Sequence, residues 1–387
     1  MARPDADELV ATLGALIGIG STYPPGDCRA IGRHIAERLH KAGYRVDTLS
    51  RQAGVDNVVA RLGQGSPQLV ISTHVDTVGV GTAEAWTSDP FTARVADGKI
   101  FGLGAANAKG SIAAQLWLAE QIAALGGPKR GELVFAFVGD GERLGPDGLA
   151  YLREIGVVKP DVLIIGGPTA NQLVIAERGV MWARITARGR TAHAGDPTSG
   201  DNAIRRMTRL IAALERALEP KLAARRDGAM QATLNIGRIA GGHNTNVVPD
   251  HCAIEIDRRL LPAETVEGAF AELCAAARSA GEPEALVEFE LLTGTPGFKA
   301  GSEGAGLKAF QAAIEAETAG PAQFLNAMGV GDGRYFARDG IEIINFGPGD
   351  GAAGHAANEW LSIAELVAAA AILSRVTGEL LGPRVVR

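Results

Sequence analysis

Two side chains able to do chemistry, His74 and Asp76, lie two residues apart just after a short apolar segment, Leu69–Ser72. That segment predicts a buried strand, and residues i and i+2 of an extended chain point to the same side. His74 can therefore present one ring nitrogen outward, while Asp76 fixes its tautomer or orients a neighbouring group. This spacing suits either metal ligation or proton transfer.

A glycine-rich turn, GLGAANAKG, follows later in the chain, with Asn107 inside it and a predicted helix beginning near Ser111. The turn lacks the GK[ST] ending and the GxGxxG spacing of phosphate-binding loops. The HxD motif and this turn resemble those of the two-zinc aminoacylase and exopeptidase family. Two segments between them share the resemblance: Trp86…Asp89-Pro90-Phe91 and DGK. That family includes acetylornithine deacetylase, succinyl-diaminopimelate desuccinylase and carboxypeptidase G.

The resemblance implies a centre of two metal ions, held by histidines and carboxylates, with a glutamate as general base. Four positions that match this centre keep a side chain of the family's type: His74, Asp76, Glu142 in GDGERLG and His355 in GHAANEW. By resemblance, His74 is a ligand of the first metal, and Asp76 is the carboxylate that supports His74 without binding the metal. Glu142 and His355 belong to the second.

Three matching positions have lost their carboxylate. Asn107 stands where the family has the Asp that bridges both metals, Gly141 where it has the general base, and Gly167, in IIGGPT, where it has the remaining acidic ligand. A neutral amide cannot bridge two cations as a carboxylate does, and glycine cannot take a proton from water. A two-metal site is therefore not expected.

The remaining set could hold no metal, or at most one divalent ion such as zinc, manganese or cobalt. Its candidate ligands are Glu142, His355, His74 and the Asn107 oxygen. An acidic residue in a shifted position, for instance Asp140 or Glu177, could also replace a lost ligand.

The positions that match the family's substrate-facing residues are intact. His193, in GRTAHAG, matches a histidine that reaches the partner subunit's site and polarises the scissile carbonyl. Asn246, in GGHNTNVVPD, and Arg259, in DRRLLP, match residues that hold the substrate. A guanidinium pairs bidentately with a carboxylate, so we expect a small amino-acid-like or acidic substrate, with Asn107 as a further contact. The resemblance also implies a homodimer.

Other polar residues are weaker candidates. Lys109 matches a lysine of the family's glycine-rich turn and is interpreted as structural. Asp332 and Arg334, in GDGRYF, match a segment near the substrate, where they either contact it or support packing. The other histidines are assigned no role: His34, His40, His243 and His251.

Strands and helices alternate in two parts of the chain, which predicts an α/β domain with a mostly parallel sheet. His74, Gly141–Glu142 and Gly167 each follow a predicted strand, so they should meet at the carboxyl edge of that sheet. Near Gly179 the pattern changes, and Met181–Arg188 alternates apolar and polar residues as an antiparallel strand does. We therefore predict a discontinuous catalytic-type domain, 1–179 and 294–387, and an inserted α+β lid or dimerisation domain, 180–293.

Composition excludes several kinds of partner. The 387 residues carry a net charge of −6 and no basic run, so neither nucleic acid nor an anionic membrane is expected. No apolar run is long enough to cross a bilayer. The three cysteines, Cys28, Cys252 and Cys274, form no CxxC pair and predict free thiols in a reducing, cytoplasmic setting.

Three hypotheses of function remain open. The first is an amide hydrolase of the family type with an altered, single-metal site. The second is a metal-independent enzyme that acts on an amino-acid-like carboxylate, with His74, Asp76, Glu142, His355 and His193 as its catalytic set. The third is a binding protein without turnover. Simultaneous loss of base and ligands, with the substrate contacts kept, favours the second.

Overall fold

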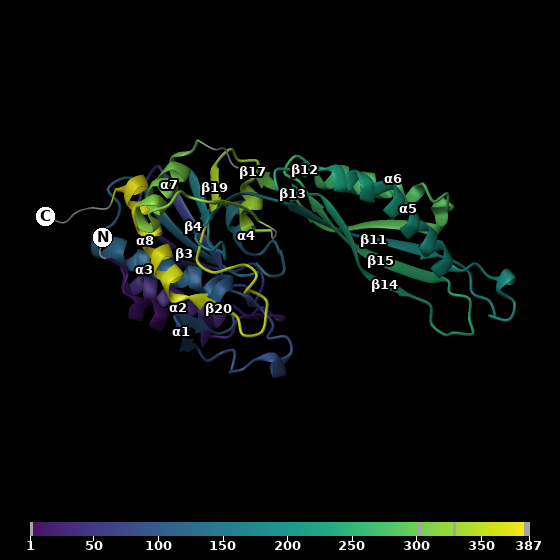
Figure 1. The fold of residues 1–387 in the computed structure, drawn as a ribbon, viewed down its shortest axis with the longest axis horizontal. Helices are drawn as coiled ribbons and strands as arrows, with labels where there is room; N and C mark the ends of the chain where they lie inside the picture. Colours follow the sequence, from purple (N-terminus) through teal and green to yellow (C-terminus); the bar gives the residue numbers. More distant parts are fainter. Residues whose placement is uncertain (1–2, 300–302, 328–329, 383–387) are drawn as a thin grey trace. The chain divides into compact units, whose positions relative to one another are not determined.

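The computed structural model describes residues 3–299, 303–327 and 330–382. The chain forms two compact units (Figure 1). The first contains the residues up to Ile175 and most of the chain after Lys299, and the second contains Ala176–Lys299. These bounds lie a few residues outside the predicted 180–293, because β10 (Leu173–Glu177) pairs with β17 (Phe298–Lys299).

The first unit is built on a sheet with the strand order β10-β19-β9-β4-β8-β3-β2. Its central strands β19, β9, β4 and β8 run parallel, and Ser72 of β4 lies opposite Ile165 of β9 and Ala136 of β8. The remaining strands are antiparallel to their neighbours. The α/β fold with a parallel sheet core is thus confirmed, with antiparallel strands at both edges. The main strands are β2 (Arg45–Leu49), β3 (Asn57–Gly63), β4 (Gln68–His74), β8 (Glu132–Val138), β9 (Val162–Ile165) and β19 (Glu342–Asn345).

Short strands complete this unit. β6, β7 and β20 form a small antiparallel sheet, and β1 pairs in parallel with β5. Their bounds are β1 (Thr22–Tyr23), β5 (Thr77–Val78), β6 (Arg94–Ala96), β7 (Lys99–Phe101) and β20 (Trp360–Ser362). A further short strand, β18 (Phe324–Ala327), pairs with β10.

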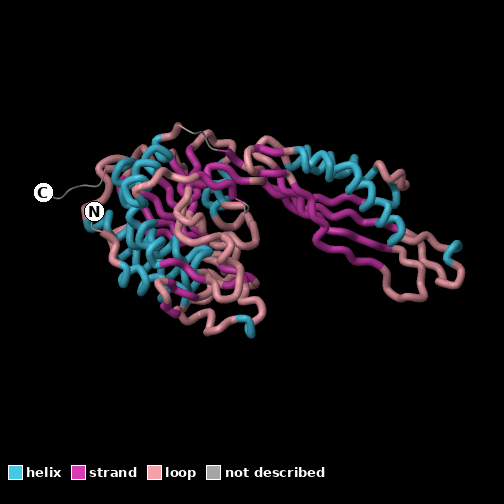
Figure 2. Tube along the Cα trace, in the orientation of Figure 1, coloured by secondary structure: helices cyan, strands magenta, loops and turns pink. Residues whose placement is uncertain are grey.

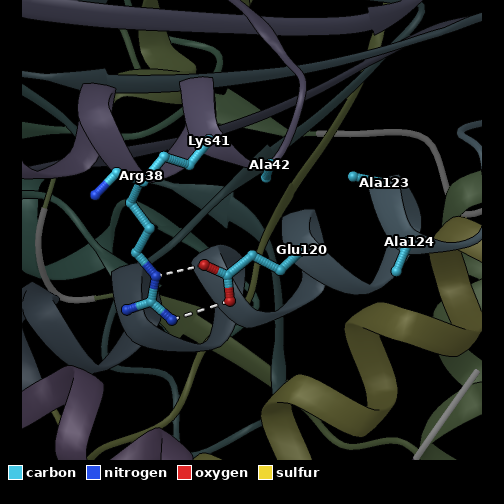
Figure 3. Close-up of a pocket in the computed structure, with 6 residues that line it drawn as sticks. All are labelled: Arg38, Lys41, Ala42, Glu120, Ala123 and Ala124. Carbon is cyan, nitrogen blue, oxygen red and sulfur yellow. Dashed lines mark hydrogen bonds and ion pairs between the residues drawn. The ribbon is translucent and has the colours of Figure 1, made fainter.

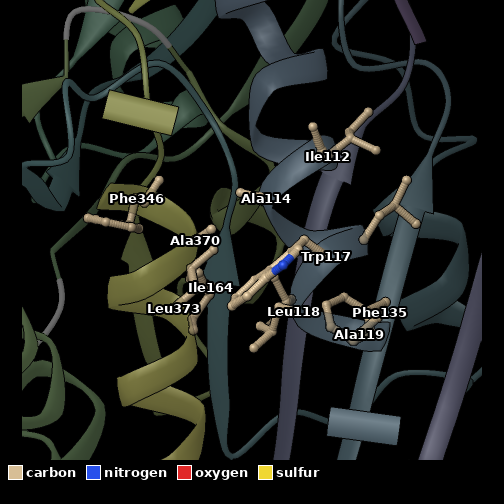
Figure 4. Packing of buried hydrophobic residues seen from close by; sticks show 14 of the residues in the cluster. Ile112, Ala114, Trp117, Leu118, Ala119, Phe135, Ile164, Phe346, Ala370 and Leu373 are labelled. Carbon is tan, nitrogen blue, oxygen red and sulfur yellow. The ribbon is translucent and has the colours of Figure 1, made fainter. Parts of the chain in front are cut away.

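Helix α3 is buried along most of its length because it packs on β4 and against α1 and α8. Figure 4 shows Trp117 of α3 beside Ile164 of β9 and Leu373 of α8. Side-chain oxygens cap the first turns of α1 and α8, from Asp5 and Ser362, which satisfies backbone N–H groups that a helix leaves free. The helices are α1 (Ala6–Ile17), α2 (Arg29–Lys41), α3 (Gly110–Ala124), α4 (Leu149–Glu154), α7 (Ala305–Thr318) and α8 (Ile363–Leu381).

The second unit is an antiparallel sheet with the order β14-β15-β11-β16, packed against α5 and α6 (Figure 2). Alternate residues of β15 are buried, including Ile254 and Ile256, as expected for a sheet with one covered face. Its elements are β11 (Gly179–Arg188), α5 (Ala203–Ala224), β12 (Arg226–Asp227), β13 (Met230–Gln231), β14 (Thr233–Gly241), β15 (His251–Leu260), α6 (Val266–Arg278) and β16 (Val287–Thr295). The strand β16 is not among those predicted from the sequence.

No helix in the described residues combines the length and the apolarity needed to cross a membrane.

Candidate active site

Four side chains of the first unit meet beyond the ends of parallel strands. His74 is the last residue of β4, and Glu142 lies in the loop that follows β8. Asn107 lies in the turn before α3, and His355 lies between β19 and β20. Hydrogen-bond distances link all four side chains. The structure thus brings together four of the side chains that the sequence analysis placed in one site.

The Asn107 amide is the centre of this cluster. Its Oδ1 lies 3.3 Å from His74 Nε2, while its Nδ2 donates to Glu142 Oε1 at 3.0 Å and lies 2.7 Å from His355 Nε2. A neutral amide thus connects two imidazoles and a carboxylate, at the position where the family resemblance implied a bridging carboxylate.

His74 is held from the opposite side by Asp76. His74 Nδ1 lies 2.9 Å from the Asp76 backbone oxygen and 3.5 Å from Asp76 Oδ1. Burial opposes the charged imidazole, but the hydrogen bond and negative charge of Asp76 outweigh it and raise the pKa of His74 to about 10. Asp76 is also buried, yet its contact with His74 and two backbone N–H groups lowers the pKa of its carboxyl. The pair is therefore ionic at neutral pH.

Glu142 and His355 form the second pair. His355 Nε2 lies 3.0 Å from Glu142 Oε1; the imidazole is 52% exposed and the carboxylate only 8%. The hydrogen bond to Glu142 raises the pKa of His355 above its ordinary value, although partial burial opposes this. The pair therefore combines a proton acceptor with an accessible proton donor.

Two buried carboxylates hold the loops that carry these side chains. Asp76 accepts hydrogen bonds from the backbone N–H groups of Gly141 and Glu142, at 3.0 and 2.8 Å. Glu359, 2% exposed, accepts from those of Gly104, Ala106 and Asn107 at 2.8–2.9 Å. Burial raises the pKa of the Glu359 carboxyl, and the three N–H donors oppose that rise.

Sequence reasoning missed Glu359, although the GHAANEW motif contains it. The available signal was an acidic residue directly before the short apolar strand β20, where a carboxylate has no reason to be buried without partners.

Substitution of Glu359 by glutamine should destabilise the turn that carries Asn107. The amide keeps the shape of the carboxylate but can direct only one oxygen at three N–H donors, so at least one buried donor is left without an acceptor. We expect the free energy of unfolding to fall by about 1–3 kcal/mol, measured by urea denaturation. The exposed Glu37 provides a control, since its change to glutamine should alter stability by less than about 0.5 kcal/mol. Equal effects of the two substitutions would contradict this role.

Of the predicted substrate-facing residues, Asn107 belongs to the first unit and His193, Asn246 and Arg259 belong to the second. His193 pairs with Val247 in an isolated β-bridge, and Ala194 N–H donates to the Asn246 oxygen at 3.0 Å, so His193 and Asn246 lie on adjacent loop segments. Arg259, on β15, donates from Nε to Asp257 Oδ1 at 2.8 Å. The roles of His193, Asn246 and Arg259 stay predictions.

The weaker candidates have local partners. Lys109 is buried and donates to the Ile19 oxygen at 2.9 Å, and burial lowers its pKa to about 8. Arg334, also buried, contacts Asp332 at 3.1 Å, and Asp332 is one of the negative charges that raise the pKa of His74. A hollow beside α2 and α3, lined by Arg38, Lys41 and Glu120, contains none of the site residues (Figure 3).

A family model described as Peptidase family M20/M25/M40 matches residues 70–379. The chain belongs to this peptidase family. A curated relative, the succinyl-diaminopimelate desuccinylase of Bordetella petrii, is 31% identical over 390 aligned residues, which cover 97% of this chain and 98% of the relative. The recognition made from the motifs is thus confirmed.

Solved structures of the M20/M25/M40 family share the fold. An M20 family metallo-carboxypeptidase from Sulfolobus solfataricus matches with a TM-score of 0.81 and 17% identity, covering 97% of this chain and 99% of that one. A Bacillus subtilis protein described as a dinuclear metal binding peptidase matches with a TM-score of 0.71 and 15% identity, over 98% and 99% of the two chains.

The side chains at this site differ from the set that the family resemblance implies for two metals, since Asn107 stands in place of the bridging carboxylate. Within residues 3–299, 303–327 and 330–382, no three His, Cys, Asp or Glu side chains are arranged to hold a metal ion. Asn107 is neutral, so it supplies neither the negative charge nor the two bridging oxygens of a carboxylate.

The suggested replacement by Asp140 is not supported. Its carboxylate accepts from the backbone N–H of Asp147 at 3.0 Å and pairs with Arg143 at 2.8 Å. Both partners compete with any metal for its oxygens. Glu177 is a buried residue of the second unit, and its part in the hypothesis stays untested.

Proposed function

We propose that the chain is an M20/M25/M40 family enzyme that acts on a small amino-acid-like carboxylate by proton transfer between its own side chains, without a two-metal centre. One observation carries the proposal. The Glu142 carboxylate and the half-exposed His355 imidazole lie 3.0 Å apart, where Asn107 also links them to His74. A buried acceptor beside an accessible donor is the arrangement that general acid–base catalysis requires.

The roles follow from the partners of each group. Glu142 accepts a proton from the substrate, and His355 donates one or returns the proton taken. His74, kept cationic by Asp76, supplies a fixed positive charge that stabilises negative charge developing on the substrate. Such a set suits proton abstraction next to a carboxylate, elimination or ring opening. Arg259 would bind the carboxylate, and Asn107, Asn246 and His193 would contact the rest of the substrate.

One observation favours a second candidate, a single-metal amide hydrolase. Three polar atoms, Asn107 Nδ2, Glu142 Oε1 and His355 Nε2, lie 2.7–3.0 Å from one another. If the side-chain amide of Asn107 were rotated by half a turn, its oxygen would replace Nδ2 in this group. One metal ion could then contact that oxygen, Glu142 Oε1 and His355 Nε2. The similarity to metal peptidases supports this candidate. The lack of a negative charge on Asn107 weighs against it, because a neutral amide binds a cation less strongly than a carboxylate does.

The deciding experiment follows proton exchange and acyl release with and without metal. We expect protein treated with a chelator and then dialysed to exchange the Cα proton of an amino-acid probe in D₂O, as seen by ¹H NMR. The probes are N-succinyl-diaminopimelate, N-acetyl amino acids, dipeptides and the free amino acids. The same activity should remain when zinc, manganese or cobalt is added.

Acyl or peptide release only after metal addition, with about one metal ion bound per chain, would establish the second candidate. A third outcome would establish a binding protein instead: a probe binds, the binding is lost when Arg259 is replaced, and neither proton exchange nor acyl release occurs with or without metal.

The predicted homodimer is part of this proposal. If His193 completes the site of a second copy, the protein should sediment as a dimer. Full activity of a monomer would exclude that role for His193.

A further inference from the structure

The two glycines that replace family carboxylates are not equivalent. A Cβ added at Gly167 meets no atom within 4 Å, so that position opens on free space. A Cβ added at Gly141 would lie 2.6 Å from His74 Cβ, 2.7 Å from His74 Cγ and 3.2 Å from His74 Nδ1. Gly141 is not among the described residues with positive φ. The restriction at Gly141 is therefore one of space and not of backbone conformation.

Asp76 explains why Gly141 lies so close to the imidazole. Its Oδ1 accepts the Gly141 N–H at 3.0 Å and lies 3.5 Å from His74 Nδ1, while its Oδ2 accepts the Glu142 N–H at 2.8 Å. One carboxylate thus draws the loop after β8 and the side chain at the end of β4 together. The side chain of His74 occupies the space that any side chain at position 141 would need.

We propose that Gly141 is a positioning residue for His74: the missing side chain lets the imidazole lie against the loop backbone and keep its bonds to Asp76 and Asn107. Gly141 is then a requirement of this site and not only the remnant of a lost base. The inference rests on the proposed function only for the role given to His74. Its test measures ring position and stability rather than turnover, so the two can fail separately.

The test compares Gly141→Ala with Gly167→Ala, the same change at the two glycines. Overpacking of a filled site displaces side chains and destabilises the fold, so we expect the thermal midpoint of Gly141→Ala to fall by several degrees. In protein labelled with ¹⁵N-histidine, the ring signals of His74 should shift, while those of the distant His34 and His40 stay in place. Gly167→Ala should leave the midpoint and the His74 signals unchanged.

A double-mutant cycle shows whether the effect of Gly141→Ala depends on contact with His74 or is a general loss of stability. The cycle remains informative if the single variant Gly141→Ala folds poorly. His74→Gly removes the three atoms nearest to the new Cβ, which are Cβ, Cγ and Nδ1 of His74. In that background, Gly141→Ala should cause no further fall of the midpoint, because the coupling exists only between residues in contact. An equal fall in both backgrounds would overturn the proposal. Unchanged His74 signals in Gly141→Ala, or the same shift in Gly167→Ala, would overturn it as well.

Discussion

Replacement of Asp76 by asparagine should lower the free energy of unfolding by about 3–5 kcal/mol at neutral pH, the usual result of removing one partner of a buried ion pair. Asp76 is 1% exposed and is the counter-ion of His74. It also accepts the N–H groups of Gly141 and Glu142. Asparagine leaves the imidazolium without a negative partner, and its amide nitrogen faces one of those N–H donors. Urea unfolding of the two proteins measures the difference.

The pH dependence of this difference follows from the pKa of His74. The folded-state value, about 10, lies above the ordinary 6.5. The contribution of the ion pair is therefore complete below pH 6.5 and is lost as the pH rises toward 10. On the acid side, the contribution of Asp76 is complete above its ordinary pKa of 3.8 and is lost progressively as the pH falls below that value toward the lowered pKa of the folded state. The deficit of Asp76→Asn should thus be largest near pH 5–6 and narrow toward pH 10.

Asp47, exposed on β2, provides the matched control. Its change to asparagine should alter stability by less than about 0.5 kcal/mol over the same pH range. A deficit for Asp76→Asn as small as that of the control, or one that does not narrow above pH 7, would contradict the buried ion pair.

The positions of several candidate residues could be predicted from the sequence because they follow strands. Apolar runs placed His74, Glu142 and Gly167 just after parallel strands, and the carboxyl ends of such strands meet at one edge of a sheet. The motifs added Asn107 and His355. Their placement could be predicted because periodicity and motif spacing are local properties of the chain, whereas their roles stay predictions.

The parts that failed depend on contacts distant in sequence. Glu359 acts through the backbone of a turn about 250 residues earlier in the chain, so its local motif shows an acidic residue but not the N–H groups that it binds. The strand β16 is an exception, because Glu288 and Glu290 alternate with apolar residues and this local pattern indicates a half-exposed strand. The contrast between Gly141 and Gly167 is also invisible in sequence, since both are simply glycine. Only the position of the His74 side chain distinguishes them.

Replacement of Glu142 by glutamine should reduce chelator-resistant turnover by about 10²–10⁴-fold, the usual contribution of a general acid or base. Glutamine preserves volume and the contacts with Asn107 and His355, but it cannot take up a proton. The rate of Cα proton exchange in D₂O measures the loss. Glu37→Gln, at an exposed position of α2, should retain full activity.

The Glu142→Gln variant also carries an internal test that needs no substrate. The hydrogen bond to Glu142 is the largest cause of the raised pKa of His355, so in the variant that pKa should return toward 6.5, as seen by NMR titration of the imidazole. If the pKa returns while turnover is unchanged, the pair exists but Glu142 is not the base. If turnover falls while the pKa stays raised, another group holds the His355 proton, and Glu142 acts alone. A fall in both is the result expected of a coupled acid–base pair, since a single contact sets the charge of His355 and provides the acceptor for the substrate proton.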